Sequence, residues 1–384
     1  MAPAVKIAIQ NQNPLTALQY FLKNLLKDED ITAILVPSHL ADKKTVMPML
    51  VTNPEKLDYA DPLAPVFPVN AAKIVSKLTR TPINKKLGVV LRPCEIRAFI
   101  ELVKLNQGSM EDLIIIGIDC LGAFKRDDYA KFIEANSGDG FKSSLKFLQD
   151  FNENKSEKAL DFDIARACRA CEHPSPENAD ISIGLIGLDF KDGLPVMANT
   201  ERGEQFLNKL HLPRAEEPEQ RKKALKKLVE NRTAYRDNMF EETRQAVSSP
   251  DKLAAYLVDC VNCYNCRVVC PACYCRECVF LTDIFDYKPW QYLGWAEQKG
   301  ALKMPVDTLF YHLTRLTHIS LSCVGCGQCS NACPNNIPIM ELFRTIAADT
   351  QKAFNYEAGR NLDEPPPMSL FEMEEFQELT DNMS

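Results

Sequence analysis

The sequence of 384 residues is poor in the features that mark several common classes of protein. It has only 5 histidines, so zinc sites that combine histidine with cysteine are not prominent. Acidic residues outnumber basic ones by 52 to 45, and the net charge of −7 argues against a nucleic-acid binder, which presents a basic face. No Gly-x-Gly-x-x-Gly or Walker motif occurs, which excludes the conventional dinucleotide and phosphate loops.

Long apolar runs are also missing. The longest candidate for a buried strand, LIIIGI at 113–118, is far shorter than the ~20 apolar residues that a membrane-spanning helix needs. The N-terminal stretch MAPAVKIAIQ lacks the charged start, the long apolar segment and the cleavage site of a signal peptide. We therefore expect a cytoplasmic protein without a membrane span.

The sequence is rich in cysteine, with 15 residues. Reducing thiol pools disfavour structural disulfides in the cytoplasm, and an odd count rules out complete intrachain pairing. The cysteines are therefore expected to bind metal or to carry out redox chemistry. They fall into three groups, namely Cys94, Cys120, Cys168 and Cys171, then seven residues between 260 and 278, and finally Cys323, Cys326, Cys329 and Cys333.

The first half of the chain alternates strand-like and helix-like stretches. The strand-like stretches are rich in Ile, Val and Leu and lie at 4–9, 31–38, 87–93, 113–119 and 181–189. Helical patterns lie between them, at 14–26, 71–78 and 95–107. This alternation predicts an α/β N-terminal domain with a largely parallel sheet.

The alternation of strand-like and helix-like stretches stops near residue 250, and we place a domain boundary there. Residues 1–245 are predicted to form the α/β domain, 250–345 a mainly helical domain that holds the dense cysteines, and 346–384 an acidic tail. A helix is predicted at 307–321, and the charged stretch 214–246 is interpreted as a solvated helix. The apolar residues of the tail leave two readings, a disordered segment or a short amphipathic piece that docks on a partner or on the chain itself: Leu370, Phe371, Met373, Phe376 and Leu379.

Two cysteine runs share the spacing Cys-x2-Cys-x2-Cys-x3-Cys-Pro, which is typical of two-cluster ferredoxins. In that pattern three cysteines wrap one cubane cluster and the fourth ligates the other one. We therefore predict one [4Fe-4S] cluster on Cys260, Cys263, Cys266 and Cys333, and a second on Cys323, Cys326, Cys329 and Cys270. Zinc knuckles are the alternative, but they use two cysteine pairs separated by a long spacer.

The first cysteine group is placed by the predicted strands. Cys94 follows one strand and begins a helix, and Cys120 ends the next strand, so both are expected at the carboxyl edge of one parallel sheet. A helix N-terminus favours anionic thiolates and clusters. Cys168 and Cys171 supply two further thiols for a third metal site. The alternative is that Cys94 and Cys120 are buried small apolar residues.

Three stretches resemble the beta subunits of coenzyme F420-reducing hydrogenases and dehydrogenases, a family that includes beta subunits of some formate dehydrogenases. They are RPCEIRAFIELVKLNQ (92–107), IIIGIDCLG (114–122) and ACRACEHPSPENADISIG (167–184), and the resemblance covers roughly residues 10 to 240. It implies a [4Fe-4S] cluster on the first cysteine group beside an FAD. The flavin would exchange two electrons as hydride with a deazaflavin or similar carrier and pass single electrons to the clusters.

A second resemblance covers the last cysteine run. SCVGCGQCSNACPNNIPI (322–339) is similar to the helical ferredoxin domains of fumarate-reductase iron–sulfur subunits and of heterodisulfide-reductase C-type subunits. In such domains two clusters act as an electron wire.

The chain departs from the first family at two glycine-containing stretches. The family has a Cys-Gly-Gly run before a Thr-Ala-Leu helix, where this sequence has Asn11-Gln12-Asn13-Pro14, and a Gly-Thr pair where it has Leu91-Arg92. Such glycines allow a backbone to approach a cofactor closely. The departures favour a flavin-free reading of the chain. Arg92 and Arg97 are interpreted either as phosphate-binding groups or as members of surface salt bridges.

Cys273, Cys275 and Cys278 remain without a role after twelve cysteines are assigned to three cubanes. Three hypotheses stand for them: an additional or interface metal site, an alternative ligand set for one cubane, or unligated thiols packed near the clusters.

Together these observations predict an iron–sulfur electron-transfer subunit of a multi-subunit oxidoreductase. Its expected partners are a formate dehydrogenase or hydrogenase catalytic subunit, or a heterodisulfide-reductase A-like flavoprotein. The competing hypotheses are a flavin-free wire or adaptor subunit and, in a third class, a zinc-dependent scaffold protein.

Overall fold

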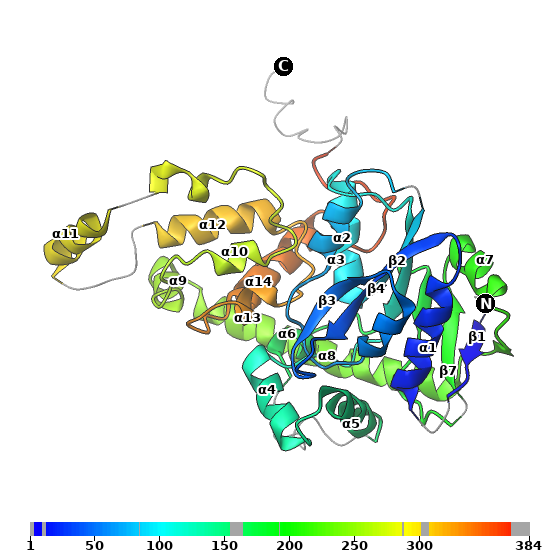
Figure 1. Cartoon of the computed structure of the whole chain (residues 1–384). Helices are drawn as coiled ribbons and strands as arrows, with labels where there is room; N and C mark the ends of the chain where they lie inside the picture. Colours follow the sequence, from blue (N-terminus) through cyan, green and yellow to red (C-terminus); the bar gives the residue numbers. More distant parts are fainter. Residues whose placement is uncertain are drawn as a thin grey trace.

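A computed structural model describes residues 4–9, 13–83, 85–153, 164–191, 193–285, 288–300 and 307–369. An α/β part with one sheet lies beside a smaller, helical part that contains the dense cysteines (Figure 1). The predicted fold class, an α/β domain followed by a mainly helical region, is confirmed. No helix of the described residues is both long and apolar enough to cross a membrane.

The sheet has eight strands in the order β3-β2-β4-β5-β6-β7-β1-β8. Its centre is parallel, with β2 against β4, β4 against β5 and β5 against β6. The outer pairs are antiparallel, so the largely parallel sheet of the prediction is a mixed sheet with a parallel centre. The strands are β1 (Ala4–Ile7), β2 (Ile31–His39), β3 (Val46–Val51), β4 (Lys86–Leu91), β5 (Leu113–Ile118), β6 (Ile181–Ile183), β7 (Leu194–Ala198) and β8 (Arg214–Ala215).

The strand predicted at 181–189 is shorter in the structure. β6 ends at Ile183, and the N–H of Gly184 still donates to the carbonyl oxygen of Pro195 on β7 at 2.9 Å. The N–H groups of Leu185 and Ile186 then leave the sheet and donate to the carboxylate of Asp119, at 2.9 and 3.2 Å. The chain thereby turns away from the sheet edge, directly beside the residue that precedes Cys120.

Helices cover both faces of the sheet. One face packs against α1 (Pro14–Leu26), α4 (Arg126–Ala135) and α5 (Gly140–Asn152), through buried residues such as Leu18, Phe132 and Phe147. The other face packs against α2 (Ala72–Leu78) and α3 (Pro93–Lys104), and its core also includes Val324 and Tyr356 from the C-terminal third of the chain. The helical part therefore shares a core with the sheet.

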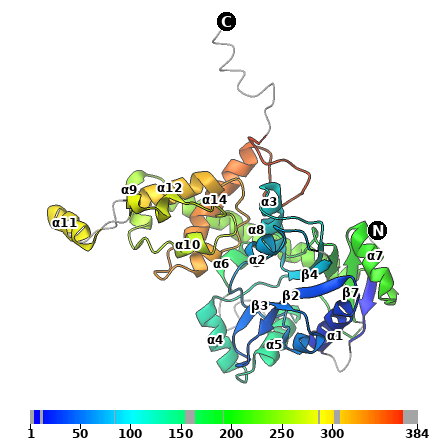
Figure 2. The same ribbon diagram turned by 45° about the horizontal axis from the view of Figure 1, so that its top comes forward.

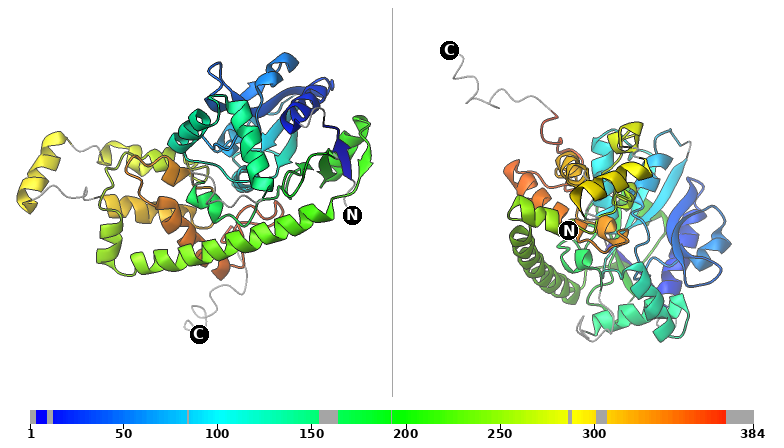
Figure 3. Two further views of the ribbon diagram at one scale, coloured as in Figure 1. Left: turned by 90° about the horizontal axis from the view of Figure 1, so that it is seen from below. Right: turned by 90° about the vertical axis from the view of Figure 1, so that its left-hand side faces the viewer.

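One long helix joins the two parts. Helix α8 (Glu219–Ala246) has 28 residues and runs along the molecule from the sheet to the helical part (Figure 3). Most of its residues are exposed, as expected for a solvated helix, but Arg221 and Arg232 are buried against the sheet side and Phe240 against the helical side. Helix α6 (Arg166–Arg169) and helix α7 (Glu201–Lys209) complete this part of the chain.

The helical part has its own apolar core, which contains Leu316, Leu342 and Phe343. Helix α12 (Thr308–Ile319) lies within the stretch 307–321 for which the sequence predicts a helix. Helix α11 stands away from the rest of the helical part in two views (Figures 1 and 2). The helices are α9 (Pro250–Tyr256), α10 (Asn265–Val268), α11 (Pro289–Lys299), α12, α13 (Gln328–Asn331) and α14 (Ile339–Ala353).

The stretch predicted as an acidic tail begins within the fold. Its residues up to Ala353 belong to α14, and the following segment lies along α3. There the Tyr356 hydroxyl donates to a carboxylate oxygen of Glu101 at 2.6 Å, and the backbone N–H of Gly359 donates to the same oxygen at 2.8 Å. We call residues 354–369 the C-terminal strap. The apolar residues from Leu370 onward lie outside the described residues.

Candidate iron–sulfur sites

The first cysteine group gathers at the carboxyl edge of the parallel strands. Cys94 is the second residue of α3, directly after β4, and Cys120 follows β5. Cys168 lies in the short helix α6, and Cys171 follows that helix. The backbone N–H of Cys120 donates to the carbonyl oxygen of Pro174 at 2.8 Å, which brings the loop after Cys171 to this edge.

The thiols of this group are close enough to influence one another. Burial raises the pKa of Cys94 well above its usual value, and charge on Cys120, Cys326 or Cys171 would raise it further. Burial also raises the pKa of Cys168 to about 12, again with Cys120 and Cys171 contributing. Buried thiolates are costly unless cations compensate them, and four cysteine thiols are the usual donor set of a [4Fe-4S] cluster. The residues present therefore fit this group.

The last cysteine run forms a tight loop around a second set of thiols. Gly325 and Gly327 have φ angles of +67° and +79°, the left-handed region that favours glycine. Burial raises the pKa of Cys326 to about 12, with charge on Cys323 adding to the shift. The pKa of Cys329 is raised by burial and by its neighbours Cys326 and Cys323.

The third set combines the first ferredoxin run with the end of the second. Burial raises the pKa of Cys260 to about 11, and charge on Cys266, Cys263 and Cys333 raises it further. One small cavity is lined by all four cysteines of this predicted set: Cys260, Cys263, Cys266 and Cys333. Cys270, the crossing ligand of the other predicted cluster, borders the same apolar core as Cys329.

No three His, Cys, Asp or Glu side chains of the described residues lie close enough together to hold one metal ion. A single zinc ion would draw its thiolates to about 2.3 Å from one centre. A cubane instead offers a separate iron to each thiolate, so its ligands lie further apart. The ligand sets remain predictions at the level of individual residues.

Helix α12 supplies polar groups to the third set. The buried guanidinium of Arg315 donates to the Cys266 sulfur at 3.1 Å and to the Cys266 carbonyl oxygen at 3.2 Å. The Tyr311 hydroxyl lies 3.2 Å from the same sulfur, and the imidazole of His312 lies 3.4 Å from the Cys260 sulfur. Hydrogen bonds to cluster sulfurs and ligands tune reduction potentials. Sequence analysis missed these residues, because no motif marks them; their only signal is their position on a predicted helix.

The three cysteine sets lie in series. Cys326 of the second set is among the charges that raise the pKa of Cys94 in the first. Cys266 of the third set is likewise among those that raise the pKa of Cys329 in the second. The set that contains Cys323 thus has one thiol near each of the other two sets, and Cys266 and Cys329 border the same small apolar cluster.

Arg344 of α14 joins the first two sets. Its guanidinium donates to the carbonyl oxygen of Ala170 at 2.7 Å and forms an ion pair with Glu172, the residue after Cys171. Burial alone would raise the pKa of Glu172, but Arg344, His173 and Arg236 outweigh it and hold that pKa at about 2. The carboxylate is therefore ionised at neutral pH and fixes the first cysteine group against α14.

Gly327 is a point of close approach between these two sets. A Cβ added there would meet the Cβ of Ala167 at 2.3 Å, in addition to the cost of the left-handed φ angle. Gly327→Ala is therefore expected to lower the free energy of unfolding by about 2–4 kcal/mol, measured as a lower urea midpoint.

Gly294→Ala is the matched control, because nothing lies within 4 Å of a Cβ at that position of α11. We expect this second substitution to be neutral or to stabilise by up to about 1 kcal/mol, since alanine favours a helix over glycine. Equal midpoints for the two variants would contradict the close packing of Gly327.

The remaining three cysteines of the crowded stretch are spread out. Cys273 contacts Cys270 and Arg315. Cys275 is exposed, and Cys278 borders the small apolar cluster that contains Cys266. The three cysteines thus have different surroundings, and their role stays a prediction.

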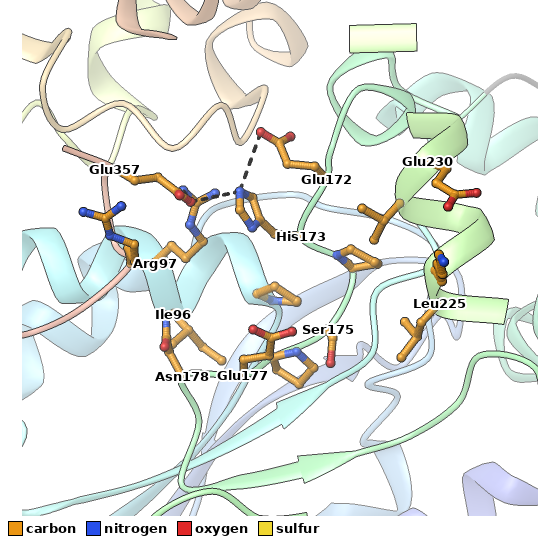
Figure 4. Close-up of a pocket in the computed structure, with 16 residues that line it drawn as sticks. Ile96, Arg97, Glu172, His173, Ser175, Glu177, Asn178, Leu225, Glu230 and Glu357 are labelled. Carbon is orange, nitrogen blue, oxygen red and sulfur yellow. Dashed lines mark hydrogen bonds and ion pairs between the residues drawn. The ribbon is translucent and has the colours of Figure 1, made fainter. Parts of the chain in front are cut away.

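A cavity of about 490 Å³ lies beside the first cysteine group (Figure 4). It is bounded by the start of α3, the loop after Cys171, the middle of α8 and the C-terminal strap. Arg97, His173 and Glu357 meet at one side of it, and His173 lies 3.3 Å from the Glu357 carboxylate. Burial, followed by the charge of Arg97, lowers the pKa of His173 to about 3, so the imidazole is neutral at pH 7.

The two arginines singled out in the sequence have partners within the protein. Arg92 donates to the carbonyl oxygens of Ala64 and Val66, at 2.7 Å each. Arg97 donates to Glu357 at 2.9 Å and to the carbonyl oxygen of Ala358 at 2.7 Å. Arg92 thus hydrogen-bonds the loop that contains Ala64 and Val66. Arg97 lines the cavity and connects α3 to the C-terminal strap through hydrogen bonds.

Where the related family has its Cys-Gly-Gly run, the described residues form a capped helix. The Asn13 side chain accepts a hydrogen bond from the backbone N–H of Thr16, and Leu15, Ala17 and Leu18 are buried in the core. Asn11 and Gln12 lie outside the described residues.

Comparison with known proteins connects these sites to a family. A family model for the C terminus of the coenzyme F420 hydrogenase/dehydrogenase beta subunit matches residues 84–220, and a 4Fe-4S binding domain matches residues 317–339. The chain resembles the beta subunits of coenzyme F420 hydrogenases and dehydrogenases. The first match spans all four cysteines of the first group, and the second spans the last cysteine run.

Three curated relatives have names of this kind. F420-dependent formate dehydrogenase subunit beta of Methanocaldococcus jannaschii is 28% identical over 376 residues, which cover 92% of this chain and 94% of that protein. F420-dependent formate dehydrogenase 1 subunit beta of Methanococcus maripaludis is 26% identical and covers 91% and 92%. Coenzyme F420 hydrogenase subunit beta of Methanococcus voltae is 26% identical over 200 residues, 48% of this chain and 70% of that protein.

The predicted resemblance to this family, joined to a ferredoxin domain, is thereby confirmed. So is the prediction of an oxidoreductase subunit that resembles formate dehydrogenase and hydrogenase beta subunits. The chain is thus similar to these beta subunits, and residues 317–339 match a 4Fe-4S binding domain.

Proposed function

We propose that the protein relays electrons through three [4Fe-4S] clusters in a multi-subunit oxidoreductase. The serial arrangement of the three cysteine sets carries this proposal, since each set has a thiol close to the next one. The names of the relatives support a formate dehydrogenase or hydrogenase type of catalytic partner.

One end of this series adjoins the cavity beside Cys94 and Cys171. We propose that a two-electron carrier, FAD or a deazaflavin, binds there and converts hydride into single electrons for the first cluster. Ile96 of α3 and Leu225 and Val229 of α8 supply apolar surface. Arg97 and Arg360 also line the cavity, each paired with a carboxylate, so phosphate groups of the carrier would compete with Glu357 and Glu364 for them. The neutral imidazole of His173 lies beside Arg97 and Glu357, on the side of the cavity away from Leu225 (Figure 4).

The other end of the series is the set at Cys260, in the helical part. It lies under an exposed surface that includes Cys263 and Val261. A partner subunit that exchanges electrons with the series would dock there. A heterodisulfide-reductase A-like flavoprotein is the second candidate partner, through the similarity of residues 322–339 to C-type subunits.

The first test is the iron and acid-labile sulfide content of protein purified without oxygen. We expect about twelve irons per chain, four for each of three cubanes. About eight irons per chain would show that the first cysteine group holds no cluster. About sixteen irons would require a further cluster on Cys273, Cys275 and Cys278. Zinc in place of iron would overturn the proposal in favour of a zinc-dependent scaffold.

The second test separates the flavoprotein from the flavin-free wire. About one FAD released per chain by acid, together with bleaching of the visible absorption by a reduced deazaflavin, supports the carrier in the cavity. Absence of flavin with full iron content favours the adaptor, which the missing glycines of the family pattern also favour.

A further inference from the structure

A second cavity, of about 350 Å³, is lined by positive charge. It is lined by residues of α2 and of the loop that follows α10. Five cationic side chains and one aromatic ring line it, and no carboxylate of the described residues does: Lys73, Lys77, Arg80, Arg267, Arg276 and Tyr274. This concentration stands out in a chain whose net charge is −7.

No Asp or Glu of the described residues pairs with the cations that line this cavity. Lys73 donates to the carbonyl oxygen of Val268 at 2.9 Å, and Arg80 donates to the side chain of Gln107 at 3.2 Å; both acceptors are neutral. The buried Nε of Arg267 has no hydrogen-bond partner among the described residues. Lys73 and Lys77 are one helical turn apart, a spacing at which like charges destabilise a helix. An anion in the cavity would relieve this repulsion.

We propose that this cavity binds the phosphoryl groups of a small molecule. Arginine binds phosphate through paired N–H groups, and lysine adds a mobile point charge. The volume is that of a small-molecule site, whereas a protein partner would meet a broader surface. The ring of Tyr274 provides a flat face on which a nucleobase could stack. We call this cavity the basic pocket.

The basic pocket borders the electron-transfer series. Cys273 lines it and contacts Cys270, the predicted crossing ligand of the second cluster. A bound anion would therefore lie near that cluster. The competing reading is that the cations only balance the negative charge of the clusters, and it predicts no affinity for phosphate.

Calorimetric titration of the iron-loaded protein with inorganic pyrophosphate tests the proposal. We expect saturable binding to the native protein and a Kd raised about tenfold or more in the double variant Lys77→Gln/Arg80→Gln, since each charged hydrogen bond contributes strongly. Lys142→Gln on α5 is the matched control, because Lys142 is exposed and far from the pocket in sequence and fold. Its Kd should equal that of the native protein.

A second arm with ADP distinguishes the source of the phosphate. If ADP binds at least tenfold more tightly than pyrophosphate and Tyr274→Ala removes the difference, the ligand is a nucleotide; equal affinities indicate phosphate alone. No binding of either anion, or equal binding by the double variant, overturns the proposal. The proposal is also overturned if the double variant changes the reduction potential of a cluster while neither anion binds to the native protein. In that case the cations only balance the negative charge of the clusters. Iron content, measured on the same samples, tests the proposed function separately.

Discussion

Replacing Cys94 by serine is expected to lower the iron content from about twelve to about eight per chain, the loss of one cubane. Cys94 lies next to Pro93, which lines the cavity beside the first cysteine group, and the thiols of Cys120, Cys171 and Cys326 are close enough to raise its pKa. In the proposed series, its cluster is the one nearest that cavity. The rate of electron transfer from a two-electron donor to the remaining clusters should therefore fall at least a hundredfold, because the first cluster of the series is missing. Rapid mixing, followed by visible absorption, measures this rate.

Cys275→Ser is the matched control for this substitution. Cys275 is exposed and lies in the loop beside the basic pocket. Its iron content and electron-transfer rate should match those of the native protein. A Cys94→Ser variant that keeps about twelve irons would show that Cys94 is a buried thiol without a cluster.

Arg221→Met is expected to lower the free energy of unfolding by about 3–5 kcal/mol, the usual cost of breaking a buried ion pair on one side. Arg221 and Asp119 are both buried, and their guanidinium and carboxylate groups are 2.7 Å apart. Burial raises the pKa of Asp119, which Arg221 and two backbone N–H groups counteract. Without Arg221, the Asp119 carboxylate is still buried but no longer has its main cationic partner.

The effect should also reach the first cluster, since Asp119 immediately precedes Cys120. The measurement is the urea midpoint together with iron retention at sub-denaturing urea. Lys222→Ala is the control, because Lys222 pairs with Glu219 on the exposed side of the same helix, and it should leave the urea midpoint nearly unchanged. Similar losses in both variants would mean that α8 itself, and not the buried pair, is the sensitive element.

Local patterns in the sequence predict the α/β class, the helix before the last cysteine run and the placement of Cys94 and Cys120 at one sheet edge. These features follow from apolar periodicity and from the direction of parallel strands. The outer antiparallel strands are not predicted as such. β1, for example, begins the chain but lies between β7 and β8, and no local pattern encodes a partner nearly two hundred residues away.

The polar environment of the cysteines is equally hidden in the sequence. Arg315 and Arg344 look like ordinary charged positions of amphipathic helices, yet both side chains are buried against cysteine loops. Their role depends on how α12 and α14 pack, which is a tertiary property. The cysteine spacing predicts which thiols share a cluster, whereas the groups that tune a cluster come from elements far away in the sequence.

The C-terminal strap has a consequence for the order in which the chain matures. Glu101 is buried on α3, where Lys104 of the same helix lies 3.3 Å from its carboxylate. Two groups of the strap, the Tyr356 hydroxyl and the Gly359 N–H, donate hydrogen bonds to the same carboxylate oxygen. Because the strap is synthesised more than two hundred residues after α3, Glu101 gains these two hydrogen bonds only after the rest of the described fold has been made. The strap also completes the cavity beside the first cysteine group, through Glu357 and Arg360, so that cavity has its full lining only at the end of synthesis.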